Sequence, residues 1–170
     1  MAAGRDRWFI DTGGKRGLQT GPNPTDRGKC GTKHHIVVDQ QGVPLAATIS
    51  AANRNDSLVM EEVIDAIPPI GGRRGRPRSR PDKAHLDKAY DSAACRQALR
   101  DRGIIPRIAR RGIESKTRLG RYRWVVERTF AWLHAFRRLR IRYERLRDAH
   151  YAFLALGCSI VCWRSLGNRF

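Results

Sequence analysis

The chain has 170 residues, with 34 Lys or Arg against 16 Asp or Glu, which gives a formal net charge of +18. Its hydrophobic fraction of 41% excludes a disordered chain, and its length fits one domain with a core of its own. The positive charge favours a polyanionic partner, DNA or RNA before others. No apolar run is long enough to span a bilayer, so the sequence predicts no membrane partner and a cytoplasmic, nucleoid-associated protein.

Strand signals come first along the chain. A short apolar run at 8–10 predicts a strand that ends at Asp11, and the Gly- and Pro-containing segment 21–31 is expected to be a loop. Two β-rich runs, 35–39 and 43–49, flank a Gln-Gln-Gly turn and together predict a β-hairpin.

Helices and strands then alternate. In chain order we first expect a helix over 58–67 capped by Asp56, and then a strand over 84–87. A second helix, capped by Asp91 or Ser92 and ended by Gly103, is followed by a strand over 104–106. Two further helices are expected over 120–139 and 149–166. The last helix is apolar on most faces, so we expect it to be buried. A hairpin followed by alternating elements predicts an α/β fold with a mixed sheet and flanking helices.

Two segments are rich in arginine. The Gly-, Arg- and Pro-rich segment 70–82 predicts a mobile basic loop, and a second cluster lies at 137–147. Arginine predominates over lysine in both, which favours forked contacts to phosphate, although a run of charge can also be a solvated face.

Three acidic residues stand out because acids are scarce in this chain: Asp11, Asp87 and Glu127. Asp87 ends an apolar strand, and the neighbouring helix cap is already supplied by Asp91 or Ser92. Asp87 therefore has no evident structural role. Asp11 also follows an apolar run, where the alternative is an ordinary aspartate between strand and turn.

Glu127 lies inside a predicted helix, between Arg123 and Arg128. One interpretation is an exposed Arg–Glu pair, and the other is a functional carboxylate held between two guanidinium groups. Carboxylates that converge in a basic protein are what metal-dependent phosphodiester chemistry requires, because divalent cations take hard oxygen ligands and arginines hold the polyanion.

The remaining metal-ligating residue types give weaker signals. His34 and His35 could bind a metal, but strand alternation turns one of two adjacent residues to solvent, so we expect no site there. The four cysteines form no CxxC pair, which predicts free thiols and no zinc site.

Five blocks of the chain resemble, in order, the catalytic part of DDE transposases from bacterial insertion sequences, with the insertion-sequence-five group as the best match. The blocks are Gly21–Lys29, Lys33–His35, Ala52–Ser57, Asp87–Asp91 and Arg123–Thr129. Each block alone is modest, but five in the right order are highly specific. The resemblance covers most of the chain, from about Gly21 to Trp163.

The resemblance implies a ribonuclease-H-like mixed sheet with flanking helices, and catalytic acids that bind two Mg²⁺ ions, with Mn²⁺ as a substitute. Asp87 matches the second acid and Glu127 the third, while Asp11 is the best candidate for the first, with Asp6 behind it. The implied activity is cleavage of DNA at the element ends, followed by strand transfer into target DNA.

The implied partner is DNA, bound by a homo-oligomer. The candidate DNA-binding residues come from the two basic clusters and from positions around Glu127, and they are Arg73, Arg74, Arg76, Arg123, Arg128, His134, Arg137 and Arg138. Residues 1–170 are expected to form a single catalytic domain without the usual N-terminal DNA-binding region, which an upstream reading frame could supply by frameshifting. The alternative is an inactive transposase remnant that only binds nucleic acid.

Overall fold

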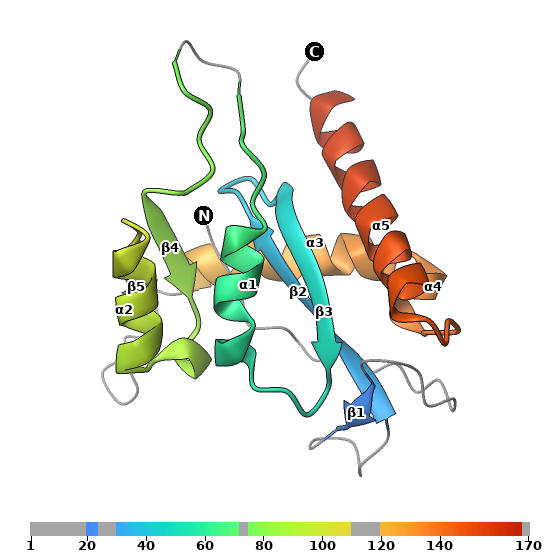
Figure 1. Ribbon diagram of the computed structural model, residues 1–170. Helices are drawn as coiled ribbons and strands as arrows, with labels where there is room; N and C mark the ends of the chain where they lie inside the picture. The colour runs from blue at the N-terminus through green and yellow to red at the C-terminus, as the bar shows by residue number, and fades with distance from the viewer. Residues whose placement is uncertain (1–19, 24–29, 72–74, 110–119, 168–170) are drawn as a thin grey trace.

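The structure is a computed structural model that describes residues 20–23, 30–71, 75–109 and 120–167, with the backbone alone for 120–123. Its strands are β1 (Gly21–Pro22), β2 (Cys30–Val38), β3 (Pro44–Ala51), β4 (Lys83–Leu86) and β5 (Ile105–Ile108). Its α-helices are α1 (Met60–Asp65), α2 (Ala93–Asp101), α3 (Gly120–His134), α4 (Arg137–Arg140) and α5 (Arg147–Gly167). Two short 3₁₀ helices, η1 (Asp56–Leu58) and η2 (Lys88–Tyr90), precede α1 and α2 (Figure 1).

The strands pair in both senses. β1, β2 and β3 are antiparallel neighbours, with His34 opposite Ile49, whereas β4 and β5 are parallel, with Lys83 opposite Ile105. The predicted α/β class and the mixture of strand directions are confirmed. The predicted strand at 8–10 lies outside the described residues.

Helices cover two faces of these strands and create two apolar clusters. On one face Val37 of β2, with Ala84 and Leu86 of β4, packs against residues of α1 and α2. On the other face Ile36 and Val38 of β2 pack against residues of α3, α4 and α5. In Figure 1, α1 and α2 lie in front of the strands and α3 runs behind them. Strand β2 is therefore covered on both faces, which explains why every residue from 31 to 38 is buried.

The predicted hairpin is confirmed, but its first strand is longer than the sequence indicated. β2 begins at Cys30, and Gly21–Pro22 pairs with it, although 21–31 was expected to be a loop. The turn between β2 and β3 is closed by the Asp39 carboxylate, which accepts hydrogen bonds from the amides of Gln41 and Val43 at 2.8 and 2.9 Å. A local Asx interaction thus fixes this turn.

One expected helix cap differs from the prediction, and another is confirmed. Asn55, rather than Asp56, caps the turn before α1 through the amide of Ser57, and α1 itself is only six residues long. Ser92 caps α2 through the amide of Cys95 at 3.1 Å. The other candidate, Asp91, instead forms a 2.6 Å ion pair with Arg96.

The C-terminal helices also differ from expectation. The helix predicted over 120–139 ends at His134, and α4 follows as a separate turn. The prediction that α5 is buried was wrong, because only one face packs, at His150, Leu154, Gly157 and Val161. Trp163 is 77% exposed. Apolar composition identified the helix but not how many of its faces have neighbours.

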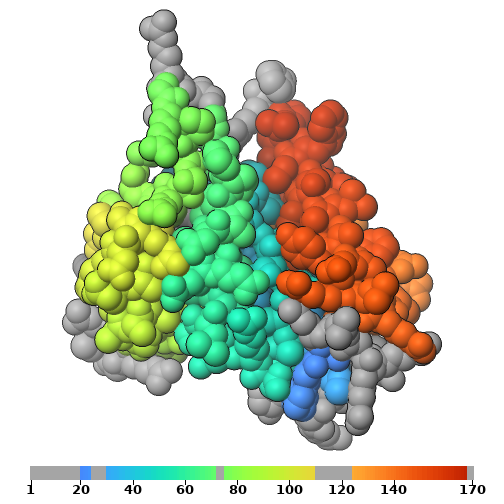
Figure 2. All heavy atoms as spheres, in the orientation of Figure 1, coloured from blue at the N-terminus to red at the C-terminus, as the bar shows by residue number. Residues whose placement is uncertain are grey.

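The basic segment between α1 and β4 projects from the body, as the space-filling view shows at its top (Figure 2). Its base is held by an antiparallel bridge in which Ile70 and Arg78 exchange backbone hydrogen bonds of 2.8 and 3.1 Å. Residues 75–80 are all exposed. In the part of the chain that the structure describes, no helix is long and apolar enough to cross a membrane.

Candidate functional site

Asp87 follows β4 directly and is buried, with 6% of its surface exposed. Its Oδ1 accepts a 2.7 Å hydrogen bond from the backbone amide of Lys88, so Asp87 is the N-cap of η2. The interpretation that Asp87 lacks a structural role was therefore wrong. A buried carboxylate at a strand end nevertheless remains a candidate metal ligand, because its oxygens are the hard donors that divalent cations take.

Strand alternation gives the direction of this carboxylate. Ala84 and Leu86 belong to the cluster beneath α1 and α2, so Lys83, His85 and Asp87 occupy the positions that face the opposite side. That opposite side is where α3 lies behind the strands (Figure 1). The fold thus turns Asp87 toward the layer that contains α3.

Glu127 lies in the middle of α3, on the exposed face of that helix. The helix is fixed to the sheet by Val126, Phe130 and Leu133, which recur with helical spacing and are all buried. Glu127 is consequently held on a rigid element, on the side of the sheet that Asp87 faces. The side chain of Arg123, the first of the two arginines predicted to flank Glu127, lies outside the described residues.

Arg128 has a different set of neighbours from the one the sequence indicated. Its guanidinium carbon lies 4.4 Å from the ring centroid of Trp124 and 4.8 Å from that of Trp132, and it donates a hydrogen bond to the Gln41 carbonyl. Cation–π contacts contribute about 0.5–2 kcal/mol each. Arg128 therefore ties α3 to the β2–β3 turn.

The neighbouring Thr129 makes a second tie to the same turn. Its hydroxyl donates to the Gly42 carbonyl at 2.7 Å, and Thr129 is fully buried. Gly42 has φ +83, and a Cβ added to it would come within 2.9 Å of the Thr129 Oγ1. Glycine is required at this position both by the left-handed backbone and by the close approach of α3.

The remaining candidates near the end of α3 differ in charge and exposure. Burial, together with the positive charge of Arg140, lowers the pKa of His134 to about 4, so this imidazole is neutral at pH 7. Arg137 and Arg138 are exposed, and Arg138 forms a 2.6 Å ion pair with Glu144. The Arg137 guanidinium is more open to an anion than that of Arg138, since among the described contacts it lies near the Tyr143 ring, 5.9 Å from the centroid.

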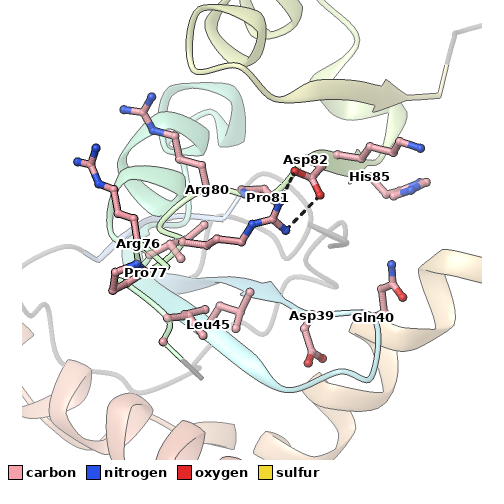
Figure 3. A pocket seen from close by; sticks show the side chains of 14 residues that line it. Asp39, Gln40, Leu45, Arg76, Pro77, Arg80, Pro81, Asp82 and His85 are labelled. Atoms are coloured by element: carbon pink, nitrogen blue, oxygen red, sulfur yellow. Dashed lines mark hydrogen bonds and ion pairs between the residues drawn. The ribbon is translucent and has the colours of Figure 1, made fainter. Parts of the chain in front are cut away.

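Arg76 lines a hollow of about 850 Å³ between the projecting segment, the β2–β3 turn and the start of β4. Figure 3 shows Arg76 and Arg80 on one side of it and His85 on the other, with Asp39 and Gln40 across from the projecting segment. Its apolar lining includes Leu45, Ile67, Ile70, Pro77 and Pro81. Arg73 and Arg74 lie outside the described residues.

Charges around this hollow are unequally neutralised. Arg78 is bound to Asp82 by two hydrogen bonds of 3.1 and 3.3 Å, the dashed pair in Figure 3. Arg80 reaches only a backbone carbonyl, 3.5 Å away, and Arg76 has no recorded partner within the described ranges. The hollow is thus a cationic site, and its volume lies within the range of ligand pockets, about 300–1,000 Å³.

Sequence reasoning did not single out Lys83 and His85, which also line this hollow. Lys83 and His85 share their strand face with Asp87, and that period-two relation was readable from the strand predicted at 84–87. Burial and the nearby positive groups lower the pKa of His85 below its ordinary value.

Both histidines of the Lys33–His35 block are buried, although one was expected to face solvent. The Nε2 of His34 lies 2.8 Å from the Nε2 of His150, and the His35 Nε2 lies 2.7 Å from the Ser50 hydroxyl. Burial is the main cause that lowers the pKa of His34 and of His150, so both are neutral at pH 7. They form a neutral polar contact within the core between β2 and α5.

The donor set of the candidate site fits a divalent cation, since Asp87 and Glu127 supply hard carboxylate oxygens on the same side of the sheet. Among the described residues, no three His, Cys, Asp or Glu side chains gather closely enough to hold a metal. Asp11 lies outside those residues, as does Asp6. Of the three predicted acids, the structure therefore describes two: Asp87 faces the layer that contains α3, and Glu127 lies on α3.

Comparison with known proteins adds independent evidence. Residues 6–162 match the family model described as Transposase DDE domain. The chain is 55% identical over 166 residues to a protein of Burkholderia cepacia named putative transposase for insertion sequence element IS402, which covers 98% of this chain and 79% of that relative. No solved structure matches the chain.

Proposed function

The chain belongs to the DDE transposase family as the catalytic DDE domain of an insertion-sequence transposase, an enzyme that acts on DNA, and we propose that Asp87, Glu127 and Asp11 are its catalytic acids. Membership of the family implies use of a divalent metal. We propose two Mg²⁺ ions, replaceable by Mn²⁺, and a ribonuclease-H-like arrangement of the sheet.

The observation that carries this proposal is the position of Asp87. It is buried at the end of β4 and occupies the strand face opposite α1 and α2, and α3, the helix that carries Glu127, packs on the corresponding face of β2. An antiparallel sheet of β1, β2 and β3, a parallel pair of β4 and β5, and helices on both faces are consistent with a ribonuclease-H-like fold.

In this proposal each acid has a defined task. The Asp87 cap on η2 fixes one carboxylate oxygen through the amide of Lys88, which holds the side chain in a single direction. Glu127 extends from a helix that is anchored to the sheet. Asp87 and Glu127 would hold a divalent ion, which would supply activation of the attacking hydroxyl and stabilisation of the leaving oxygen of the phosphodiester. Hydrolysis at an element end and attack of the freed 3′-hydroxyl on target DNA are the two proposed reactions.

The proposed DNA contacts come from the cationic hollow and from α4. The cationic hollow supports a phosphate-binding role for Arg76 and adds Arg80 and Lys83 as candidates, because their side chains line the same hollow. Arg137 and Arg138 on α4 are exposed and suit the same role. Arg123, Arg73, Arg74 and His134 remain candidates from sequence.

A homo-oligomer on DNA is also proposed, with the exposed apolar side chains of α5, including Trp163 and Leu166, as support. Fusion to an upstream reading frame remains a proposal that genomic sequence upstream of the coding region tests directly.

An inactive remnant that only binds nucleic acid is the competing proposal. A supercoiled plasmid incubated with the purified chain and Mg²⁺ distinguishes the two, since a functional acid set produces nicked or linear DNA and EDTA stops the reaction. Binding without any cleavage at all Mg²⁺ and Mn²⁺ concentrations would favour the remnant.

A further inference from the structure

We propose that Arg128 is a positioning residue for Glu127, locking α3 against the β2–β3 turn so that the Glu127 carboxylate keeps the direction a metal ligand needs. The inference rests on the proposed function of Glu127. It gives Arg128 a role in the metal site in place of a contact to DNA phosphate.

The contacts of Arg128 define this lock. Its guanidinium is stacked between Trp124 and Trp132, one helical turn before and after it, at 4.4 and 4.8 Å. The same group donates to the Gln41 carbonyl. A guanidinium held on both flanks and at one edge has little freedom to reach out to a phosphate.

Thr129 and Gly42 make the second half of the lock. The Thr129 hydroxyl donates to the Gly42 carbonyl at 2.7 Å and lies 3.1 Å from the Val125 carbonyl. The absence of a Cβ at Gly42 allows this approach, since a Cβ would lie 2.9 Å from the Thr129 Oγ1 and 3.1 Å from an Arg128 nitrogen. Arg128 and Thr129, which are adjacent on α3, therefore both bind the β2–β3 turn.

Because Glu127 is on the same helix, these contacts also fix the direction of its side chain. Successive residues are about 100° apart around an α-helix, so fixing Arg128 and Thr129 against the turn fixes the rotation of α3 and, with it, the direction of Glu127. The turn is itself rigid, because the Asp39 carboxylate accepts two of its backbone amides. A roll of the helix would move the Glu127 carboxylate sideways, and small displacements of a ligand weaken metal sites strongly.

The test compares wild type with Arg128→Ala, Gly42→Ala and Glu127→Gln, and Arg164→Ala serves as a charge-matched control on the exposed face of α5. Mn²⁺ affinity is measured by calorimetric titration, and DNA affinity is measured across a salt series. Thermal unfolding confirms that each variant is folded. Gly42→Ala is the decisive second variant, because it disturbs the same lock without changing any charge.

We expect Arg128→Ala and Gly42→Ala each to weaken Mn²⁺ binding by roughly 10–100-fold, the range for residues that support metal ligands. The slope of log K against log salt should equal that of Arg164→Ala. Unchanged Mn²⁺ affinity in both variants would overturn the inference, as would a slope reduced by about 0.9 in Arg128→Ala alone, which marks a lost phosphate contact. A wild-type Mn²⁺ affinity that Glu127→Gln leaves unchanged would instead overturn the proposed function, and the inference with it.

Discussion

Lys33 on β2 and Asp56 in η1 form an ion pair of 2.8 Å in which the lysine side chain is 2% exposed and the aspartate 12%. The ammonium also donates to the Arg54 carbonyl. This pair joins the centre of the sheet to the connection that leads into α1. It also explains why Asp56 does not cap that helix, because its carboxylate is already committed to Lys33.

Removal of Asp56 should therefore be costly. Asp56→Ala removes one carboxylate partner from the buried Lys33 ammonium, and breaking a buried ion pair costs about 3–5 kcal/mol. Urea unfolding of the two proteins measures the difference. The exposed Arg78–Asp82 pair, with side chains 74% and 72% exposed, is the matched control, and Asp82→Ala should cost less than about 1 kcal/mol. Equal losses from the two substitutions would contradict a special role for the buried pair.

Salt dependence separates the open arginines of the hollow from the paired one. If Arg76 and Arg80 each contact a phosphate, the double variant Arg76→Ala/Arg80→Ala should lower the slope of log K against log salt by about 1.8, at roughly 0.9 per phosphate on duplex DNA. The control is Arg78→Ala/Asp82→Ala, which removes a bound pair without changing net charge. Identical slopes for wild type and the Arg76→Ala/Arg80→Ala variant would mean that the projecting segment is a solvated face that does not contact DNA.

His134 should make stability fall in mild acid. Its pKa is about 4 in the folded chain and near its ordinary value of 6.5 when unfolded. Between those pH values the unfolded chain binds a proton that the folded chain does not. The free energy of unfolding therefore decreases as the pH is lowered, by up to about 1.4 kcal/mol per pH unit. In His134→Gln the decline of the unfolding free energy between pH 6 and pH 4.5 should be shallower by this amount. A decline as steep as that of wild type would mean that His134 titrates normally in the fold.

Local sequence signals predicted the elements whose chemistry is also local. The hairpin, the strand before Asp87, the cap at Ser92 and the helix that carries Glu127 all follow from turn residues or from hydrophobic period. The start of β2 at Cys30 was not predicted, because its pairing partner Pro22 lies in a segment with loop composition.

Long-range packing accounts for what sequence could not predict. Strand alternation gave one exposed histidine in the pair His34 and His35, yet both are buried because helices cover both faces of β2. Composition likewise predicted a buried α5, whereas Trp163 is open. For the candidate site, Asp87 and Glu127 were proposed from residue type and resemblance, but the contact between Arg128 and the β2–β3 turn depends on residues 87 positions apart.

The central claim, that Asp87 is a metal ligand in a DNA-cleaving site, is tested most directly by Asp87→Asn. Asparagine retains a side-chain oxygen that can cap η2 through the amide of Lys88, so the fold should be preserved while the charge that binds a cation is lost. The measurement is Mg²⁺-dependent cleavage of a labelled DNA carrying the element end, together with DNA affinity in the same buffer. We predict that cleavage is abolished and that DNA affinity is equal or higher, because a negative charge near phosphate is removed. Cleavage by Asp87→Asn at the wild-type rate would contradict the assignment.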